Sequence, residues 1–302
     1  MDCKYITPSV TIFKADGTVD LEAMERHFDF LIQGGVDGIL ILGSIGEFFS
    51  MPMEEKKKLI RCAVKHIAGR VKLIVGTTSM VTEEIIELSK FAHREGADAC
   101  IILPPYYFPL SAASIENYYD HIASQLADQE LYLYNFPDRT GYTIPVPTTL
   151  NLLRKHKNIK GYKDTQAGVS HTLELVKTVK KEFPYFEVYA GFDDNFAHNV
   201  LSGGNGCIGG LSNLVPEVCH AWVDAFRRED LAAAREVQMK INGLMEIYQV
   251  GTPFVPYIKA AIGRRGLEVS SKASFPFVAP TIDDLEKIDR ILEKCGIEKV
   301  NG

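Results

Sequence analysis

Lys163 lies in the segment Gly161-Tyr162-Lys163-Asp164-Thr165, directly after the short β-like run Ile159 to Tyr162. A helical pattern begins several residues later, so we expect its amine at the carboxyl end of a strand, where α/β barrels keep their reacting groups. Burial favours a neutral amine, and a neutral amine attacks a ketone to form a Schiff base. A lone lysine more often lays its stem over apolar surface and keeps its amine in water, so this chemistry depends on its neighbours.

Hydroxyl-bearing residues follow two other predicted strands and would supply the proton transfers that imine chemistry requires. Ser44 lies in Gly43-Ser44-Ile45-Gly46-Glu47, and Tyr134 lies in Tyr134-Asn135-Phe136-Pro137. A tyrosine can exchange protons with a substrate when a chain of hydroxyl groups carries them onward, and Ser44 and Tyr107 would complete that chain. Backbone N–H groups of the Ser44-Ile45 turn could hold a ketoacid carboxylate. Taken singly, each of these residues has a plainer explanation in packing or turn formation.

These residues meet only if eight strand-helix units close into a barrel. Short β-branched runs alternate with amphipathic stretches and begin roughly 20 to 35 residues apart, the length of one strand, one helix and two turns. Such a pattern predicts a parallel α/β barrel whose strand ends share one rim. The expected strands are Tyr5 to Phe13, Val36 to Leu42, Lys72 to Gly76, Ala99 to Leu103, Leu131 to Tyr134, Ile159 to Tyr162, Glu187 to Gly191 and Cys207 to Gly210.

The last third of the chain shows helical periodicity without further strands. The stretches are Pro216 to Arg228, Leu231 to Tyr248, Pro253 to Arg265 and Ile282 to Cys295. We therefore expect a barrel over residues 1–215 and a C-terminal helical extension of the same domain over residues 216–302. A doubly wound open sheet is the competing architecture, because it also alternates strands and helices.

The segment Gly204-Asn205-Gly206-Cys207-Ile208-Gly209 matches the letters of a dinucleotide-binding fingerprint. The fingerprint follows a strand and opens a helix, whereas this segment follows a helical pattern and contains a strand. We therefore expect no nucleotide cofactor, and we expect these glycines to let the backbone approach a ligand at the eighth strand. Gly191, at the end of the seventh strand, and Ile208 are expected to contact the same ligand.

Asp193 and Asp194 follow the seventh predicted strand and have two interpretations. They are expected to cap the next helix, which is the commonest use of aspartate in that position. Together with His198 they could instead be offered as metal ligands, but no other convincing ligand set accompanies them. We therefore expect a protein without a metal or cofactor.

Composition narrows the classes of function. The net charge of −6 provides no basic field for nucleic acid, because the 33 lysines and arginines are scattered along the chain. The six cysteines form no Cys-x-x-Cys pair and are expected to be reduced and mostly buried. The N-terminus lacks the apolar core of a signal peptide, and no apolar run approaches the length of a membrane span. A cytosolic protein with a small-molecule ligand is the expected class.

The quoted motifs at Ser44, Tyr134 and Lys163 together resemble those of the dihydrodipicolinate synthase and N-acetylneuraminate lyase family of pyruvate-dependent aldolases. The resemblance extends over nearly the whole chain. It implies a barrel, a Schiff base between lysine and pyruvate, and commonly a homotetramer built of dimers. Carried over by matching motifs, it gives Lys163 the Schiff-base role, Tyr134 proton transfer and Ser44 the hydroxyl relay. It also implies that Tyr107 reaches the site of a neighbouring subunit.

Within the family, four segments look most like those of the 2-keto-3-deoxy-sugar-acid aldolases: Ile12 to Gly17, Leu42 to Phe48, Tyr134 to Pro137, and Thr252 to Val255 with Ile258 and Lys259. Ile45 stands where the synthases usually have a second threonine, so only its backbone amide can serve the ligand. Arg139 favours the synthases instead, since it stands where they have an arginine that binds the carboxylate of aspartate semialdehyde. With Gly43 completing the turn, the expected substrate contacts are Gly43, Ile45, Arg139, Gly191 and Ile208.

The sequence therefore predicts a class I lyase that cleaves a 2-keto-3-deoxy sugar acid to pyruvate and an aldehyde, or catalyses the condensation. Dihydrodipicolinate synthase, which condenses pyruvate with aspartate semialdehyde, is the alternative enzyme. A noncatalytic barrel that binds ketoacids is the alternative of another class; it would need neither Lys163 nor Tyr134. Neither nucleic acid nor a membrane is an expected partner.

Overall fold

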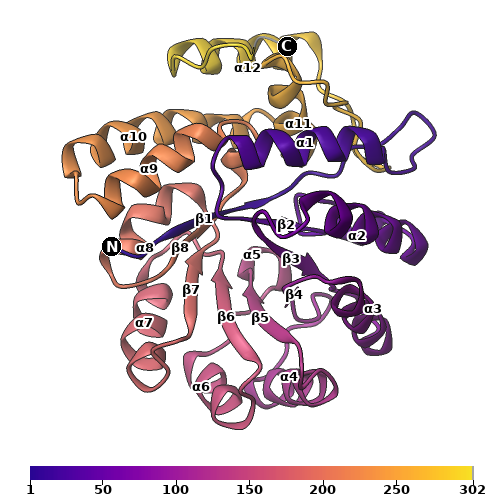
Figure 1. The fold of residues 1–302 in the computed structure, drawn as a ribbon, viewed down its shortest axis with the longest axis vertical. Helices are drawn as coiled ribbons and strands as arrows, with labels where there is room; N and C mark the ends of the chain where they lie inside the picture. The colour runs from indigo at the N-terminus through magenta and orange to yellow at the C-terminus, as the bar shows by residue number, and fades with distance from the viewer. Residues whose placement is uncertain (301–302) are drawn as a thin grey trace.

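The computed structural model describes residues 1–300 and contains a closed barrel of parallel strands that pair in sequence order, β1 to β8 (Figure 1). The predicted barrel is therefore confirmed, and the open-sheet alternative is wrong. The strands are β1 (Lys4–Pro8), β2 (Gly38–Ile41), β3 (Lys72–Gly76), β4 (Ala99–Ile102), β5 (Glu130–Asn135), β6 (Ile159–Asp164), β7 (Glu187–Ala190) and β8 (Gly206–Ile208).

The helices cover the outer face of the barrel, because parallel strands must be buried on both faces. Consecutive outer helices pack side by side from α1 to α4 and on through α6 and α7. The α-helices are α1 (Leu21–Gln33), α2 (Met53–Ile67), α3 (Thr82–Glu95), α4 (Ala112–Gln125), α5 (Pro137–Thr140), α6 (Val146–Lys155), α7 (Ser170–Glu182), α8 (Phe196–Leu201), α9 (Pro216–Arg227), α10 (Leu231–Leu244), α11 (Val255–Arg264) and α12 (Ile282–Lys294). Short 3₁₀ helices are η1 (Phe48–Ser50), η2 (Asp193–Asn195), η3 (Gly210–Asn213) and η4 (Met245–Gln249).

Two strand boundaries differ from the prediction in ways that matter to the site. The first strand ends at Pro8, and the apolar residues from Val10 to Phe13 are buried in a loop rather than in the sheet. Burial alone therefore explains their apolar character. The sixth strand continues to Asp164, so Lys163 is its penultimate residue. Lys163 still lies at the carboxyl end, as predicted.

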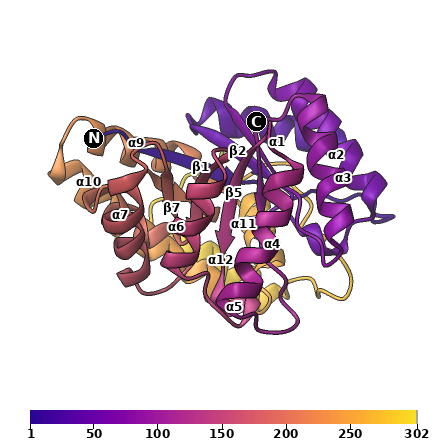
Figure 2. The same cartoon turned by 90° about the horizontal axis from the view of Figure 1, so that it is seen from below.

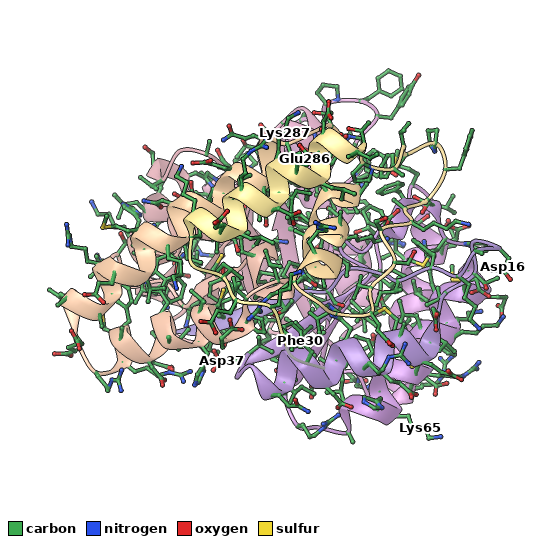
Figure 3. All side chains as sticks on the ribbon, turned by 90° about the horizontal axis from the view of Figure 1, so that it is seen from above. Asp16, Phe30, Asp37, Lys65, Glu286 and Lys287 are labelled. Carbon is green, nitrogen blue, oxygen red and sulfur yellow. The ribbon has the colours of Figure 1, made fainter. Side chains whose placement is uncertain are left out.

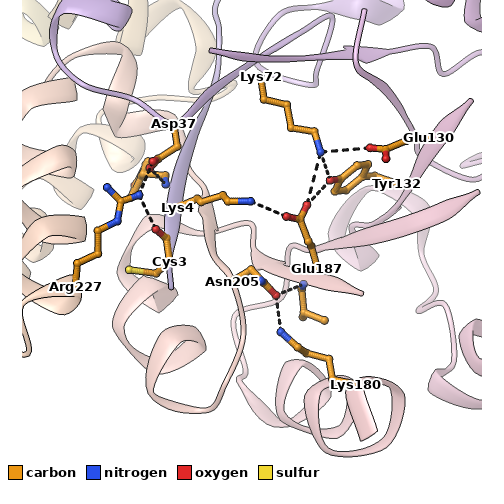
Figure 4. Close-up of polar contacts among 12 residues, drawn as sticks. Cys3, Lys4, Asp37, Lys72, Glu130, Tyr132, Lys180, Glu187, Asn205 and Arg227 are labelled. Atoms are coloured by element: carbon orange, nitrogen blue, oxygen red, sulfur yellow. Dashed lines mark hydrogen bonds and ion pairs between the residues drawn. The ribbon is translucent and has the colours of Figure 1, made fainter. Parts of the chain in front are cut away.

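The amino end of the barrel is closed by a network of charged and hydroxyl groups (Figure 4). The Glu187 carboxylate accepts hydrogen bonds from Lys4, at 2.8 Å, and from the Tyr132 hydroxyl. Lys72 donates to the Tyr132 hydroxyl at 2.7 Å and lies 3.5 Å from Glu130. These groups join four strands at the end opposite the site, where a barrel's residues serve stability rather than chemistry.

The C-terminal helices lie together beside the barrel, and α12 is the outermost of them in Figure 1. Figure 2 shows the same ribbon from below. α9 packs against β1 and α10, and α11 packs against α12. α12 buries Ile288, Ile291 and Leu292 and exposes Glu286 and Lys287, which Figure 3 labels on its outer side. The amphipathic pattern of this stretch therefore reflects its docking onto the rest of the chain.

All six cysteines are free thiols, and all but Cys295 are buried. The expectation of mostly buried cysteines is confirmed. No helix within residues 1–300 combines the length and the apolar character that crossing a membrane requires.

Candidate active site

Lys163 and Tyr134 face each other from adjacent strands. They are register partners on β6 and β5, so their side chains leave the sheet on the same face. Both are buried, each with 4% of its surface exposed. The Lys163 Nζ lies 4.4 Å from the centroid of the Tyr134 ring. The register of β5 and β6 therefore places the Lys163 amine beside the Tyr134 phenol, as the sequence predicts.

The turn after β2 brings Ser44 to the same place. The Ser44 and Tyr134 hydroxyl oxygens are 3.3 Å apart, within hydrogen-bonding distance. Glu47 adopts the left-handed region, with φ 58°, where the turn passes into η1. Within residues 1–300 the backbone N–H groups of Ser44 and Ile45 donate to no other backbone carbonyl. They are therefore available to an anion, as the sequence predicts.

A cavity of about 190 Å³ opens beside the Lys163 amine. It receives side chains or backbone from most of the predicted site residues. Those that line it are Ser44, Ile45, Tyr134, Arg139, Lys163, Gly191 and Ile208. The cavity is bounded by segments far apart in the chain that meet at the carboxyl rim of the barrel.

Gly43 and Tyr107 are the predicted site residues that do not line this cavity. Gly43 forms part of the turn, where its carbonyl accepts a hydrogen bond from the Phe48 N–H. Tyr107 is 78% exposed and packs edge to face against Phe108, with ring centroids 4.9 Å apart. Its hydroxyl therefore does not join the Ser44–Tyr134 pair of its own chain.

Arg139 lies in the short helix α5. Among residues 1–300 Arg139 forms no ion pair with a carboxylate within 4.0 Å, not even with the adjacent Asp138. Its guanidinium instead stacks over the Phe136 ring, 5.2 Å from the centroid. The charge is thus held at the cavity wall without being neutralised.

Gly191 lines the cavity, but its lack of a side chain has a second reason. A Cβ atom at this position would lie 1.8 Å from the Thr165 Oγ1. Thr165 is buried, lines the same cavity, and its hydroxyl has no hydrogen-bond partner within the described part of the chain. Because buried hydroxyls are rarely left unpaired, Thr165 is a candidate for ligand contact, although its motif alone gives it no role.

Asp193 is the clearest residue that the sequence analysis misread. It was expected to cap a helix, but α8 begins after Asn195 and no side chain caps it. The Asp193 carboxylate is buried and accepts from the Tyr5 hydroxyl at 2.5 Å, the Tyr248 hydroxyl at 3.0 Å and the Leu211 N–H at 2.9 Å. Burial raises the pKa of Asp193, which these hydrogen bonds partly oppose. Asp193 also lines the cavity.

The C-terminal helical region also contributes walls to the cavity. Met245 and Tyr248 come from η4, and Phe254 precedes α11. A second cavity of about 490 Å³ adjoins the first and shares Ser44, Phe136, Arg139, Tyr248 and Phe254 with it. Its further aromatic walls are Phe48, Phe49, Tyr106 and Phe277.

The glycines at positions 204, 206 and 209 do not line the cavity, and close packing accounts for two of them. A Cβ atom on Gly206, whose φ is +119°, would lie 1.9 Å from the Lys4 carbonyl oxygen of β1. A Cβ atom on Gly209 would lie 2.5 Å from both Asp193 Oδ1 and the Tyr5 hydroxyl. These glycines therefore allow close packing within the protein. Within residues 1–300 no cluster of three or more His, Cys, Asp or Glu side chains could hold a metal ion.

Comparison with known proteins shows to which family the chain belongs. The Dihydrodipicolinate synthetase family model matches residues 3–295. The probable 2-dehydro-3-deoxy-D-pentonate aldolase YjhH of Escherichia coli K12 is 36% identical over 292 residues, which are 97% of each chain. The putative 2-dehydro-3-deoxy-D-gluconate aldolase YagE of the same strain is also 36% identical, over 93% of this chain and 92% of its own.

Solved structures show the same relationship. The crystal structure of E. coli YagE in complex with pyruvate superposes with a TM-score of 0.95 at 34% identity and covers 98% of this chain and 99% of YagE. Dihydrodipicolinate synthase from Thermotoga maritima superposes with a TM-score of 0.92 at 28% identity, covering 98% and 99% of the two chains. On this agreement of sequence and fold, the chain belongs to the dihydrodipicolinate synthetase family.

Proposed function

We propose that this protein is a class I lyase that cleaves a 2-keto-3-deoxy sugar acid to pyruvate and an aldehyde, or catalyses the reverse condensation. The observation that carries the proposal is the Lys163 amine over the Tyr134 ring, with the Tyr134 hydroxyl 3.3 Å from Ser44. An amine, a phenol and a hydroxyl relay are the groups that imine formation and carbon–carbon cleavage require. Two relatives whose names specify this substrate class support the choice.

The proposed chemistry begins when the Lys163 amine adds to the C2 ketone; the resulting hydroxyl leaves as water with the proton of the Tyr134 hydroxyl, which produces an iminium ion and a Tyr134 phenolate. Tyr134 then takes the proton of the C4 hydroxyl while the C3–C4 bond breaks, releasing the aldehyde and sending the bonding electrons into the iminium. Protonation of the resulting enamine at C3 and hydrolysis release pyruvate and free the amine. The N–H groups of Ser44 and Ile45 hold the carboxylate throughout.

A homotetramer built of dimers is part of the proposal, since Tyr107 cannot serve the relay of its own chain. Its 78% exposure leaves it free to enter the site of a second copy. Exposed apolar side chains on neighbouring rim loops would be covered by the same contact. They are Phe49, Met80, Val81 and Phe108. A cytoplasmic location is likewise proposed, consistent with free cysteine thiols.

Arg139 supports the second candidate function, dihydrodipicolinate synthase. Its guanidinium lines both cavities and has no carboxylate partner within residues 1–300, so it could bind the distal carboxylate of aspartate semialdehyde. The 4-hydroxy-tetrahydrodipicolinate synthase of Kosmotoga olearia is 31% identical over 95% of this chain. A 2-keto-3-deoxy sugar acid releases a neutral aldehyde and does not need this charge.

The decisive experiment is borohydride reduction in the presence of pyruvate, followed by peptide mass spectrometry. We expect the reduced pyruvyl adduct on the peptide that contains Lys163 and none in Lys163→Ala. The same adduct would be absent from a noncatalytic ketoacid-binding barrel. Cleavage of a panel of 2-keto-3-deoxy acids, measured beside condensation of pyruvate with aspartate semialdehyde, then separates the two enzymes. An adduct on another lysine would overturn the mechanism.

A further inference from the structure

A polar network lies directly behind the Lys163–Tyr134 pair, on the opposite face of the same two strands. Asn135 and Asp164 follow Tyr134 and Lys163 and are themselves register partners. Because side chains alternate along a strand, the catalytic pair points into the barrel and this second pair points toward the outer helices. The Asn135 Nδ2 donates to Asp164 Oδ1 at 2.8 Å.

Asp164 is buried, and all its acceptor positions are used. Its Oδ1 also accepts from Gln166 at 3.3 Å, while its Oδ2 accepts from Thr172 Oγ1 at 2.7 Å and meets His171 Nδ1 at 2.9 Å. Four donors around two oxygens suit an ionised carboxylate. Burial alone would raise the pKa of Asp164, but these hydrogen bonds and the His171 charge bring it below its ordinary value.

The protonation state of His171 follows from its two neighbours. Its Nδ1 faces the Asp164 carboxylate, and its Nε2 lies 3.1 Å from the Ile144 carbonyl oxygen. Both neighbours are acceptors only, so both ring nitrogens must carry hydrogen, and His171 is an imidazolium. Loss of either proton would set a nitrogen lone pair against an oxygen lone pair.

Other groups near His171 do not replace this interaction. Its ring packs beside Tyr162, with centroids 5.9 Å apart, and Glu174 on α7 adds a favourable charge. His171 lies in the first turn of α7, where the helix dipole disfavours a cation. Burial also lowers the pKa of His171, yet the hydrogen bond and charge of Asp164 outweigh it and keep the pKa above 6.5.

The network joins four segments that surround the site. Ile144, whose carbonyl accepts from His171, also donates its N–H to Asn135 Oδ1 at 3.0 Å. His171 and Thr172 belong to α7, Asp164 to β6 and Asn135 to β5. A closed circuit therefore runs from α7 through β6 and β5 to the segment before α6 and back to His171.

We propose that His171 is a positioning residue: as an imidazolium that bridges Asp164 and the Ile144 carbonyl, it holds the ends of β5 and β6 in the register that sets Tyr134 against Lys163. The proposal rests on the proposed function, because it assigns His171 to the support of the imine-forming pair. His171 itself lies outside the cavity. Its deprotonation would loosen the circuit and separate the amine from its proton-transfer partner.

The test compares three variants in the rate at which pyruvate forms the borohydride-trappable imine. His171→Gln removes the charge and one of the two donors, and we expect the rate at pH about 7 to fall about tenfold, as small misplacements of reacting groups commonly cause. His171→Arg keeps a charge that does not titrate and should retain most of the rate. Thr172→Val is the matched control, because it removes one Asp164 hydrogen bond without removing charge, and its rate should stay within about twofold.

The ratio of wild-type rate to His171→Arg rate across pH isolates the contribution of His171. This ratio should be constant at low pH and fall as the pH rises through the pKa of His171. Nitrogen-15 NMR of the imidazole measures that pKa directly, and we expect it above 6.5. If His171→Gln does not fold, the pH dependence of this ratio alone decides whether His171 has the positioning role. A wild-type imine rate in folded His171→Gln, or a ratio independent of pH, would overturn the positioning role. Failure of the wild type itself to trap pyruvate would instead overturn the proposed function, and the positioning role with it.

Discussion

The buried ion pair between Lys259 and Glu47 offers the sharpest test of how the C-terminal helices support the site. Both side chains are 0% exposed, and the Lys259 amine donates to a Glu47 carboxylate oxygen. The other carboxylate oxygen accepts from the Ser274 N–H at 2.6 Å and the Ser274 hydroxyl at 2.7 Å. Lys259 also donates to the Lys272 carbonyl at 2.9 Å. The pair therefore ties α11 and the loop at Lys272 to Ser274 to the turn that carries Ser44.

Replacing Lys259 with methionine preserves most of its volume and leaves the Glu47 carboxylate buried without its cation. Breaking a buried pair in this way typically costs about 3 to 5 kcal/mol of folding free energy. We expect a loss of about 3 kcal/mol, because Ser274 still donates two hydrogen bonds to the carboxylate. The double variant Glu47→Gln/Lys259→Met removes the uncompensated charge and should be more stable than Lys259→Met by at least about 1 kcal/mol.

Urea unfolding followed by circular dichroism measures these differences, and the imine assay reports their effect on the site. The control is Lys287→Met, whose partner Asp284 is 3.2 Å away but whose own side chain is 52% exposed. An exposed pair of this kind contributes at most about 1 kcal/mol. We also expect the KM for pyruvate to rise in Lys259→Met, since Glu47 directly follows the Ser44-Ile45-Gly46 turn. A loss for Lys259→Met no larger than for Lys287→Met would refute the reasoning.

Other predictions concern the site and its pH dependence. Tyr134→Phe should lower kcat roughly 10²- to 10⁴-fold in steady-state kinetics, with the imine still trapped; an unchanged kcat would remove Tyr134 from proton transfer. Tyr107→Phe protomers mixed with Lys163→Ala protomers should regain activity, whereas inactive mixed oligomers would show that each chain supplies its own relay. Arg139→Ala should change kcat/KM for a neutral-ended keto-deoxy acid only modestly but lower it at least about tenfold for aspartate semialdehyde. Burial alone would raise the pKa of Glu187, but its hydrogen bonds with Lys4 and Tyr132 bring that pKa below 4.5. The free energy of unfolding that the ionised Glu187 contributes should therefore be lost as the pH falls through the lowered pKa. Urea unfolding at a series of pH values measures this loss, and Glu187→Gln should not show it.

The barrel and the residues at its rim could be predicted because they depend on local pattern. Short apolar runs separated by amphipathic stretches specify parallel strands and covering helices, and strand order then follows chain order. Once Lys163 and Tyr134 are placed at the ends of adjacent strands, register alone brings them together. The motif around Ser44 likewise follows its own strand directly, so its position needed no long-range information.

The rest depended on contacts between residues far apart in the chain. Asp193 looked like a helix cap because its local surroundings are those of a cap, yet Tyr5 and Tyr248 hold its carboxylate from opposite ends of the sequence. The length of β1 was overestimated because a buried loop and a buried strand select the same apolar residues. The charge on His171 arises only when Asp164 and the Ile144 carbonyl converge on its two nitrogens. Such features are properties of three-dimensional proximity, which periodicity and spacing along a chain do not encode.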